Sequence, residues 1–174
     1  DSFKDNLSKI NAFKAEVIRG YGSYIGAMFR WVWQSGLSIE LPKAIVYGAD
    51  RMVDHDRWLI ENEFKVPVIS SYQSAEALRI GFQCERRNGF HINLDDVALR
   101  VIDQNGNEVS SGEIGEIVIS NLTNRATVLL NYKLGDMVTL DGSPCPCRRT
   151  LPTIGRIEGR ADDLIVIANG HVIH

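Results

Sequence analysis

Three cysteines and one histidine form the clearest chemical pattern in the sequence. Cys84 and His91 are separated by six residues, and Cys145 and Cys147 flank a single proline. Three thiolates and one imidazole complete a tetrahedral ligand set for zinc and leave no open position for catalysis. The pattern therefore predicts a structural zinc site. The alternative is that Cys84 is a small buried hydrophobic residue and that the Cys-Pro-Cys loop binds nothing.

Three further segments carry residue types that could bind a nucleotide. Tyr72 and Glu76 follow an expected buried strand, where a tyrosine could stack on a base and an acid could hold a metal ion. Asp136 follows a glycine, and its carboxylate could accept two hydrogen bonds from a ribose diol. Arg160 and Asp162 belong to a charged cluster that could act as a hinge. Each segment also has an ordinary structural reading, namely a packed tyrosine with a solvated acid, a turn residue and a solvated loop.

Two different spacings of hydrophobic residues predict the helices and strands around these side chains. Helical spacing predicts helices near residues 3–13 and 24–34, and Gly36 ends the second. Residues 44–47, 57–64 and 68–69 read as strand, helix and strand with short connections, which is typical of a parallel βαβ unit. Residues 97–102, 115–120, 137–140 and 154–157 have the pattern of antiparallel strands. The predicted fold class is α/β, with a βαβ parallel-sheet piece followed by a small antiparallel β-barrel-like subdomain.

Length and composition exclude several classes of protein. The chain has 174 residues, of which 44% are hydrophobic and 24% charged, with a formal net charge of −3. This composition can bury a sizeable core but shows no charge cluster for nucleic acid. No apolar run reaches the roughly eighteen residues needed to span a bilayer, and no signal-peptide pattern opens the chain. An odd number of cysteines fits a reducing compartment, so the sequence reads as soluble and cytoplasmic.

The order of the motifs resembles the adenylate-forming superfamily of acyl-CoA synthetases, luciferases and peptide-synthetase adenylation domains. A strand ending in Gly-Ala is followed by Tyr-x-x-x-Glu, then Tyr-x-x-Gly-Asp, then Gly-Arg-x-Asp-Asp. Within the superfamily, the sequence is similar to the phenylacetate–CoA ligase branch and its capsular-polysaccharide-type relatives. The segments that carry this resemblance are residues 47–49, 112–116, 144–147 and 154–160. Similar cysteine and histidine positions recur in that branch.

The resemblance implies a nucleotide-binding role for each matching residue. Tyr72 would stack on the adenine ring. The backbone of Gly48 and Ala49 would line the adenine and acyl pocket. Asp136 would grip the ribose hydroxyls, and Arg160 would support the ribose and the phosphate.

The resemblance also implies the catalytic residues and a division of the chain. Glu76 would help to hold magnesium near the phosphates, Arg160 would assist there, and Asp162 would lie at the hinge to a C-terminal lid. Residues 1–76 would then be the α/β part of the large adenylation domain, and residues 77–160 a β-rich subdomain with the zinc site. Residues 161–174 would be the hinge and the start of a C-terminal domain. The expectation is a fragment truncated just after the hinge, with the phosphate loop and the lid lysine elsewhere.

Three positions depart from the family pattern. The family has Tyr-Gly-x-(Thr/Ser)-Glu where this chain has Gln73 and Ala75. The hydroxyl that would contact the α-phosphate is therefore missing. Leu134 replaces a common threonine before the Gly-Asp pair. These departures bear on the efficiency of adenylation, whereas Asp136 and Glu76 match the family pattern.

The sequence therefore predicts part of an ATP-dependent, AMP-forming acid–thiol ligase that makes an acyl-adenylate and then a thioester. Its partners would be a small carboxylic acid, ATP with Mg²⁺, and coenzyme A as a substrate, with structural Zn²⁺ and with no nucleic acid or membrane. The isolated fragment is expected to be inactive, and the sequence is compatible with a homodimer. The alternative is a catalytically degraded, zinc-stabilised module that binds a nucleotide or a partner, which Gln73 and Ala75 favour.

Overall fold

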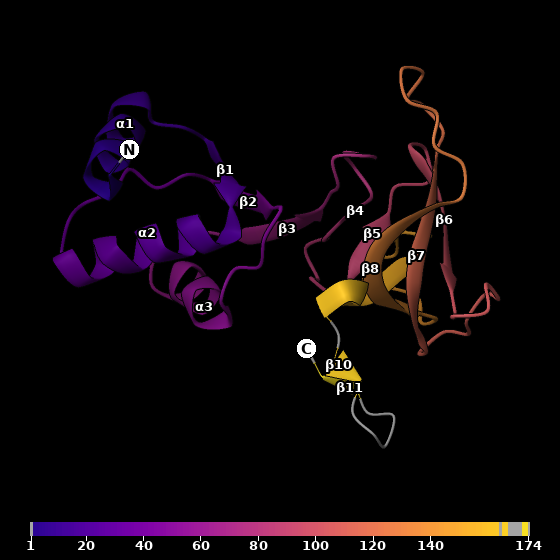
Figure 1. The fold of residues 1–174 in the computed structure, drawn as a ribbon. Coiled ribbons are helices and arrows are strands. Elements are labelled where there is room, and N and C mark those ends of the chain that lie inside the picture. Colours follow the sequence, from indigo (N-terminus) through magenta and orange to yellow (C-terminus); the bar gives the residue numbers. More distant parts are fainter. Residues whose placement is uncertain (1, 164, 167–171, 174) are drawn as a thin grey trace. The chain divides into compact units, whose positions relative to one another are not determined.

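The computed structural model describes residues 2–163, 165–166 and 172–173 of the chain (Figure 1). The chain forms two compact units, Asp1–Ser71 and Tyr72–His174. The predicted start of a C-terminal domain falls partly outside the described residues, because residues 164, 167–171 and 174 are not among them.

The first unit is the predicted α/β piece. It contains α1 (Phe3–Phe13), β1 (Val17–Tyr21), α2 (Gly22–Ser35), β2 (Ala44–Gly48), α3 (Asp54–Asn62) and β3 (Val68–Tyr72), except that the last residue of β3, Tyr72, belongs to the second unit. The strands pair in parallel in the order β1-β2-β3. A capping box between Ser2 and Asp5 starts α1, because each side chain bonds a backbone N–H that the helix leaves unpaired. The βαβ unit predicted from residues 44–69 is thus confirmed as β2-α3-β3.

The core of the first unit lies between the sheet and the two helices that follow β1 and β2. Phe29 of α2 and Ile60 of α3 are almost fully buried, and so are Ile45 and Val68 on the neighbouring strands. Alternate residues of β2 and β3 are buried, as the two-residue period of a strand requires. The alternation determines which strand residues face this core. Gly48 is the last residue of β2.

The second unit is antiparallel. Its strands are β4 (Gly81–Phe82), β5 (Phe90–Ile92), β6 (Val97–Ile102), β7 (Ile114–Asn121), β8 (Tyr132–Asp141) and β9 (Thr153–Arg160). They pair in the order β4-β5-β9-β8-β7-β6. A short 3₁₀ helix, η1 (Ala161–Asp163), follows, and β10 (Ile165–Val166) pairs with β11 (Val172–Ile173). The antiparallel prediction is confirmed, but barrel closure is not seen, since no pairing of β6 with β4 occurs among the described residues.

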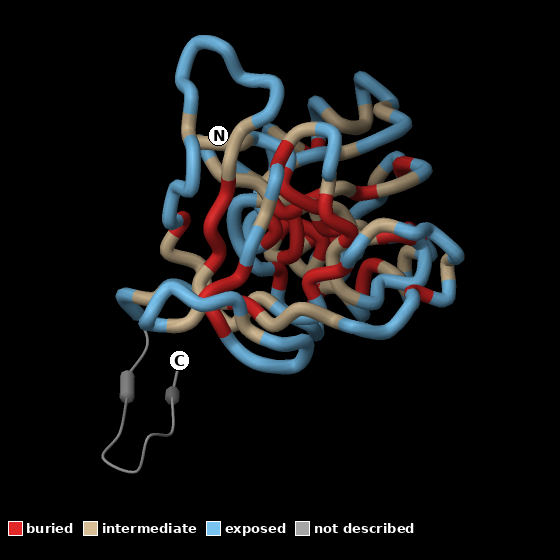
Figure 2. Tube along the Cα trace, turned by 90° about the vertical axis from the view of Figure 1, so that its right-hand side faces the viewer, coloured by how far each residue is buried: buried red, intermediate tan, exposed pale blue. Residues whose placement is uncertain are grey.

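The core of the second unit gathers residues from nearly every strand of its sheet. Ile117 and Ile119 of β7, Val138 of β8 and Ile154 of β9 have no exposed surface. Figure 2 shows buried segments in the interior, surrounded by exposed loops. The register shifts at one place in the β7–β8 pair and at two places in the β8–β9 pair. The strands of this sheet and their connections carry the residues of the candidate site.

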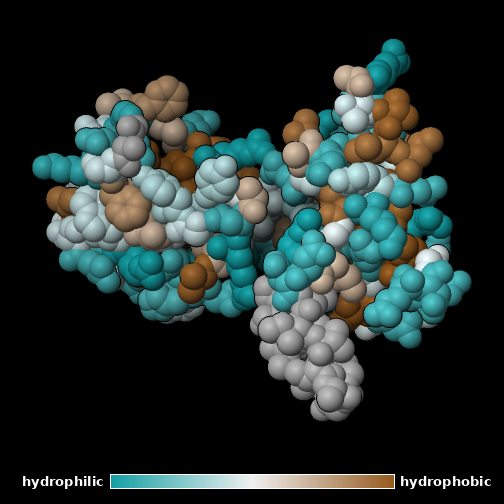
Figure 3. Space-filling model, viewed as in Figure 1, coloured by the Kyte–Doolittle hydropathy of each residue, from teal (hydrophilic) through white to brown (hydrophobic). Residues whose placement is uncertain are grey.

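Some apolar side chains remain on the surface of the second unit. Leu122, Val128 and Leu130 are 56%, 67% and 71% exposed on the connection between β7 and β8. Figure 3 shows hydrophobic residues gathered on this protruding segment. None of the helices in the described part of the chain is both long enough and apolar enough to cross a membrane.

We expect Ile117→Ala to lower the free energy of unfolding by about 2–5 kcal/mol, because it removes a fully buried side chain and leaves a cavity. Ile114→Ala on the same strand is the matched control, since Ile114 is 49% exposed. Its cost should stay within about 0.5 kcal/mol on a surface position. Urea unfolding of both variants measures the difference, and equal costs would contradict the placement of the core.

Candidate functional site

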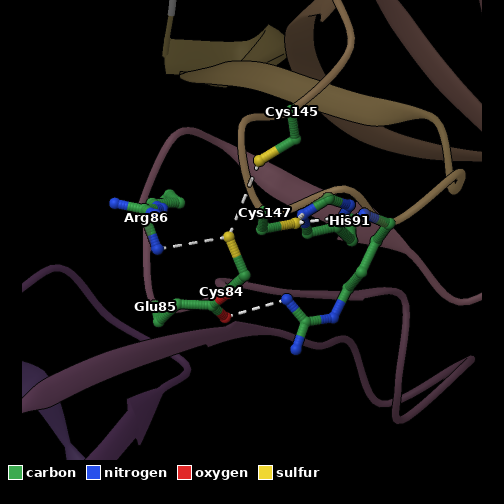
Figure 4. Close-up of polar contacts among 7 residues, drawn as sticks. Cys84, Glu85, Arg86, His91, Cys145 and Cys147 are labelled. Atoms are coloured by element: carbon green, nitrogen blue, oxygen red, sulfur yellow. Dashed lines mark hydrogen bonds and ion pairs between the residues drawn. The ribbon is translucent and has the colours of Figure 1, made fainter.

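The four predicted metal ligands come together in the second unit. Cys84 lies in the turn after β4, His91 in β5, and Cys145 and Cys147 in the loop that joins β8 to β9. Their ligand atoms all lie within 4.8 Å of one another. Figure 4 shows the three sulfurs and the imidazole of His91 gathered at one point. The cluster is mostly buried, and His91 has no exposed surface.

Two distances within the cluster are close to those of a zinc tetrahedron. The Cys84 and Cys145 sulfurs are 3.7 Å apart, and zinc–sulfur bonds of about 2.3 Å at tetrahedral angles require about 3.8 Å. The Cys147 sulfur lies 3.3 Å from Nε2 of His91, where a zinc tetrahedron requires about 3.6 Å between sulfur and nitrogen. The cysteines are free thiols. The donor set and these two distances therefore fit a zinc ion.

Backbone N–H groups point at two of the three sulfurs in the cluster. The N–H of Arg86 points at the Cys84 sulfur at 3.4 Å, and the N–H of Arg149 points at the Cys147 sulfur at 3.5 Å. Donors aimed at sulfur stabilise the thiolate, which is the form that binds a metal. An ion pair of 2.8 Å between Arg149 and Glu85 ties the two ligand loops together.

The pKa values of two thiols in the cluster shift in opposite directions. Burial acts to raise the pKa of the Cys147 thiol, but the N–H and guanidinium of Arg149 outweigh it and lower that pKa to about 6. The pKa of Cys145 is raised: the Cys147 N–H acts to lower it, but burial and the neighbouring thiols outweigh that. Neighbouring thiolates repel one another in the absence of a cation, and a bound cation removes this conflict.

The second ring nitrogen of His91, Nδ1, lacks the hydrogen bond that is expected of a metal-bound histidine. A metal-bound histidine usually donates its other N–H to an oxygen acceptor. Nδ1 of His91 is buried without a hydrogen-bond partner. Before His91 in the chain, Gly89 lets the backbone pass close to β9. Its φ is +69°, and an added Cβ would lie 2.2 Å from the carbonyl oxygen of Ile154.

A second cluster forms around Asp136 on β8. The Tyr72 hydroxyl donates to Oδ2 of Asp136 at 2.5 Å, and Nη1 of Arg160 donates to Oδ1 at 3.0 Å. The same Arg160 nitrogen donates to the carbonyl oxygen of Leu134 at 2.9 Å. Strand pairing sets Asp136 opposite Arg160. Three predicted nucleotide-binding residues thus converge within one unit.

The residues before Asp136 give this cluster its shape. Gly135 has a φ of +80°, and an added Cβ would lie 3.0 Å from Nη2 of Arg160, so a side chain there would press on the guanidinium. Leu134 is buried in the core of the sheet. A leucine at this position therefore contributes apolar packing to the core, and its carbonyl oxygen still receives Arg160.

Tyr72 is held firmly at the end of β3. It is 8% exposed, and its ring lies 6.1 Å from the ring of Phe90. Burial, followed by the hydrogen bond to Asp136, raises the pKa of the Tyr72 phenol. The bond to Asp136 also raises the pKa of Arg160. Tyr72 therefore remains a protonated donor and Arg160 remains a cation.

Glu76 lies near this cluster in the sequence and has partners of its own. The hydroxyl of Tyr132 lies 3.5 Å from Oε1 of Glu76, and Nδ2 of Asn121 donates to the Glu76 carbonyl oxygen at 2.8 Å. The sequence reasoning did not find Tyr132 or Asn121, although Tyr132 stands in the quoted Tyr-x-x-Gly-Asp motif. Their contacts cross 56 and 45 residues, which no local spacing reveals.

The remaining predicted residues lie outside these clusters. Gly48 ends β2 in the first unit, and Ala49 after it has a φ of +68°, an uncommon conformation for a residue with a Cβ. Asp162 lies in η1 directly after β9. The pocket role of Gly48 and Ala49 and the hinge role of Asp162 stay predictions.

Known proteins resemble this chain over most of its length. It is 31% identical over 170 residues to phenylacetate-coenzyme A ligase of Thermus thermophilus, which covers 94% of this chain and 38% of that protein. It is 29% identical over 168 residues to Protein CapK of Staphylococcus aureus, covering 95% and 36%. No family model matches the chain.

A solved structure shares the fold. The crystal structure of 2-hydroxyisobutyryl-CoA ligase in the postadenylation state, in complex with 2-HIB-AMP, has a TM-score of 0.86 and 20% identity, and the match covers 99% of this chain and 38% of that one. The chain thus spans 36% to 38% of the length of these relatives.

Fold and sequence together define the class of protein. The chain belongs to the adenylate-forming ligase superfamily. Within that superfamily it belongs to the branch that contains the phenylacetate-coenzyme A ligases and CapK.

We expect Gly135→Ala to lower the free energy of unfolding by more than Gly112→Ala does. Both glycines have a positive φ, but no atom lies within 4 Å of a Cβ added at Gly112, so both variants share the roughly 1–2 kcal/mol cost of the left-handed conformation. Only Gly135→Ala also displaces Arg160 from Asp136. The extra cost should be about 0.5–1 kcal/mol because Arg160 is largely exposed. Urea unfolding of the two variants measures it, and equal costs would mean that Arg160 moves aside freely.

Proposed function

We propose that this chain is the nucleotide-binding, zinc-stabilised region of an ATP-dependent, AMP-forming carboxylate ligase. The observation that carries the proposal is the Asp136 carboxylate, which Tyr72 and Arg160 hold at both oxygens. An anchored, 14% exposed carboxylate is a suitable acceptor for a ribose diol. Membership of the ligase superfamily makes ATP the matching nucleotide.

The complete ligase would carry out two steps. A carboxylate oxygen of the acid attacks the α-phosphate of ATP, the bond to the β-phosphate oxygen breaks, and pyrophosphate leaves with an acyl-adenylate formed. The thiol of coenzyme A then attacks the acyl carbonyl, AMP leaves, and the thiol proton is released. Asp136 would orient the ribose through its hydroxyls, and Arg160 would face the developing phosphate charge. Rate enhancement of this kind comes from positioning and preorganised charge.

Glu76 is the candidate magnesium ligand. Glu76 is partly exposed. Tyr132 contacts its carboxylate, and Asn121 holds its backbone carbonyl oxygen. Magnesium in nucleotide sites is usually held by one or two carboxylates together with substrate phosphates, so a single restrained carboxylate fits. When bound, magnesium would neutralise phosphate charge.

The three cysteines and His91 would hold a structural zinc. Four protein ligands fill a tetrahedral coordination sphere, so this ion has no position left for a substrate. Its function would be to fasten the β8–β9 connection to the β4–β5 segment. The metal would therefore act through folding and stay outside the ligase chemistry.

Substrate and partner assignments belong to the complete enzyme. The acid is a small carboxylic acid, and coenzyme A is the acceptor, by analogy with the names of the relatives. Gly48 and Ala49 would line the pocket for adenine and the acid, and Asp162 would serve as the hinge of the lid. A cytoplasmic location fits these soluble substrates.

The second candidate function is a degraded member of the same fold that binds a nucleotide or a partner without ligase activity. Gln73 and Ala75 favour it, because the α-phosphate hydroxyl of the family pattern is absent. Pyrophosphate release from ATP by the complete protein, measured with a panel of carboxylic acids, separates the two. Acid-dependent release supports the ligase, and ATP binding without release supports the degraded module.

We expect Asp136→Ala to weaken ATP binding to the complete ligase by at least about tenfold, which corresponds to 1.4 kcal/mol. The variant removes charge-assisted hydrogen bonds worth roughly 1.5–3 kcal/mol each. Asp95→Ala is the control, since Asp95 is an exposed carboxylate elsewhere on the same unit. Calorimetry measures the affinity of both variants for ATP. An unchanged affinity in Asp136→Ala would contradict the assignment of Asp136 to the ribose.

We expect the protein to purify with about one zinc per chain, and Cys145→Ser to lose it and to melt at a lower temperature. Zinc binding contributes to folding energy, here locally because a core already exists. Ser143→Ala is the matched control in the same exposed loop and should keep both the zinc and the melting temperature. Elemental analysis and thermal unfolding, with and without a strong chelator, provide the readouts. A wild-type protein without metal, unaffected by the chelator, would refute the zinc site.

A further inference from the structure

The Asp136 carboxylate is anchored at both of its oxygens. Arg160 donates to Oδ1 at 3.0 Å and Tyr72 donates to Oδ2 at 2.5 Å. A carboxylate has about four lone-pair sites, two on each oxygen. Each anchor occupies one of them, so one acceptor site per oxygen remains. Two acceptor sites on neighbouring oxygens match the two adjacent hydroxyls of a ribose.

The two anchors differ in how firmly they are themselves held. The side chain of Arg160 is 53% exposed, although its Nη1 also donates to Leu134. Tyr72 is 8% exposed, and its ring packs in the core of the sheet and near Phe90. Its backbone oxygen accepts a hydrogen bond of 3.1 Å from the N–H of Ile80. Tyr72 is therefore the rigid anchor of the pair.

The Tyr72 phenol also keeps its proton. Burial and the adjacent Asp136 raise its pKa, so the hydroxyl stays a donor at neutral pH. A fixed donor removes rotational freedom from the carboxylate before the nucleotide arrives, which lowers the entropy cost of binding.

We propose that Tyr72 is a positioning residue for the ribose: its hydroxyl fixes the rotation of the Asp136 carboxylate so that one free acceptor site on each oxygen faces the 2′- and 3′-hydroxyls. This inference rests on the proposed nucleotide function. It assigns to Tyr72 a role in recognising the sugar, distinct from stacking of its ring on adenine.

The two roles of Tyr72 separate experimentally because they use different parts of the side chain. Tyr72→Phe keeps the ring and its packing and removes only the hydroxyl. A stacking role alone predicts no change in nucleotide binding for this variant. A positioning role predicts weaker recognition of the ribose hydroxyls, and the retained ring should keep the fold intact.

The test compares ATP with 2′,3′-dideoxy-ATP, which lacks both hydroxyls, on the complete ligase by calorimetry. The ratio of the two affinities measures ribose recognition. Asp136→Ala should abolish the preference for ATP. Tyr72→Phe should reduce it by about three- to tenfold, in the range of coupling between contacting residues, while dideoxy-ATP binding stays nearly constant. Adding Tyr72→Phe to Asp136→Ala should reduce it no further.

Tyr21→Phe is the control for loss of a phenol, since Tyr21 is 63% exposed on β1. Tyr72→Phe with the wild-type preference for ATP overturns the positioning role while leaving the ligase proposal intact. Equal weakening of both nucleotides also overturns it, because that outcome indicates a general disturbance. A wild-type enzyme that binds neither nucleotide overturns the proposed function and this inference together.

Discussion

Pairing between β8 and β9 is the constraint on which both side-chain clusters depend. Its register sets Asp136 opposite Arg160, and the loop that connects the two strands carries Cys145 and Cys147. The next pairing outward, between β9 and β5, sets His91 beside Thr153. A slip of one residue would turn every side chain of a strand to the other face. One hairpin and its neighbour thus fix the candidate metal ligands and the candidate ribose acceptor at once.

The metal cluster and the Asp136 cluster lie at opposite ends of this hairpin. A restraint on the strands at one end therefore affects their alignment at the other. A zinc ion on Cys84, His91, Cys145 and Cys147 would close the turn end and hold β5 against β9. The closed end would keep the register that aligns Asp136 with Arg160. A bound metal would therefore support nucleotide binding while taking no part in the chemistry, because it restrains the strands rather than the substrate.

Packing and polar function are combined in single residues of this sheet. Leu134 fills the core with its side chain and receives Arg160 with its carbonyl oxygen. Tyr72 packs its ring in the same core and offers its hydroxyl to Asp136. Burying a polar group is costly unless it is hydrogen-bonded. These contacts keep a mostly buried carboxylate hydrogen-bonded and oriented, which a flexible surface aspartate would not be.

The amino-acid sequence was enough to predict the main helices and strands and to identify the chemical groups available for a site. Hydrophobic spacing gave the βαβ unit and the antiparallel strands, since periodicity depends on near neighbours in the chain. The types of Cys84, His91, Cys145 and Cys147 were enough to predict a tetrahedral ligand set, and motif order was enough to indicate the superfamily. Three features needed the three-dimensional structure: the sheet of the second unit does not close among the described residues, Leu134 belongs to its core, and Tyr72 reaches Asp136. That contact spans 64 residues, and it depends on strand register, which local spacing does not encode.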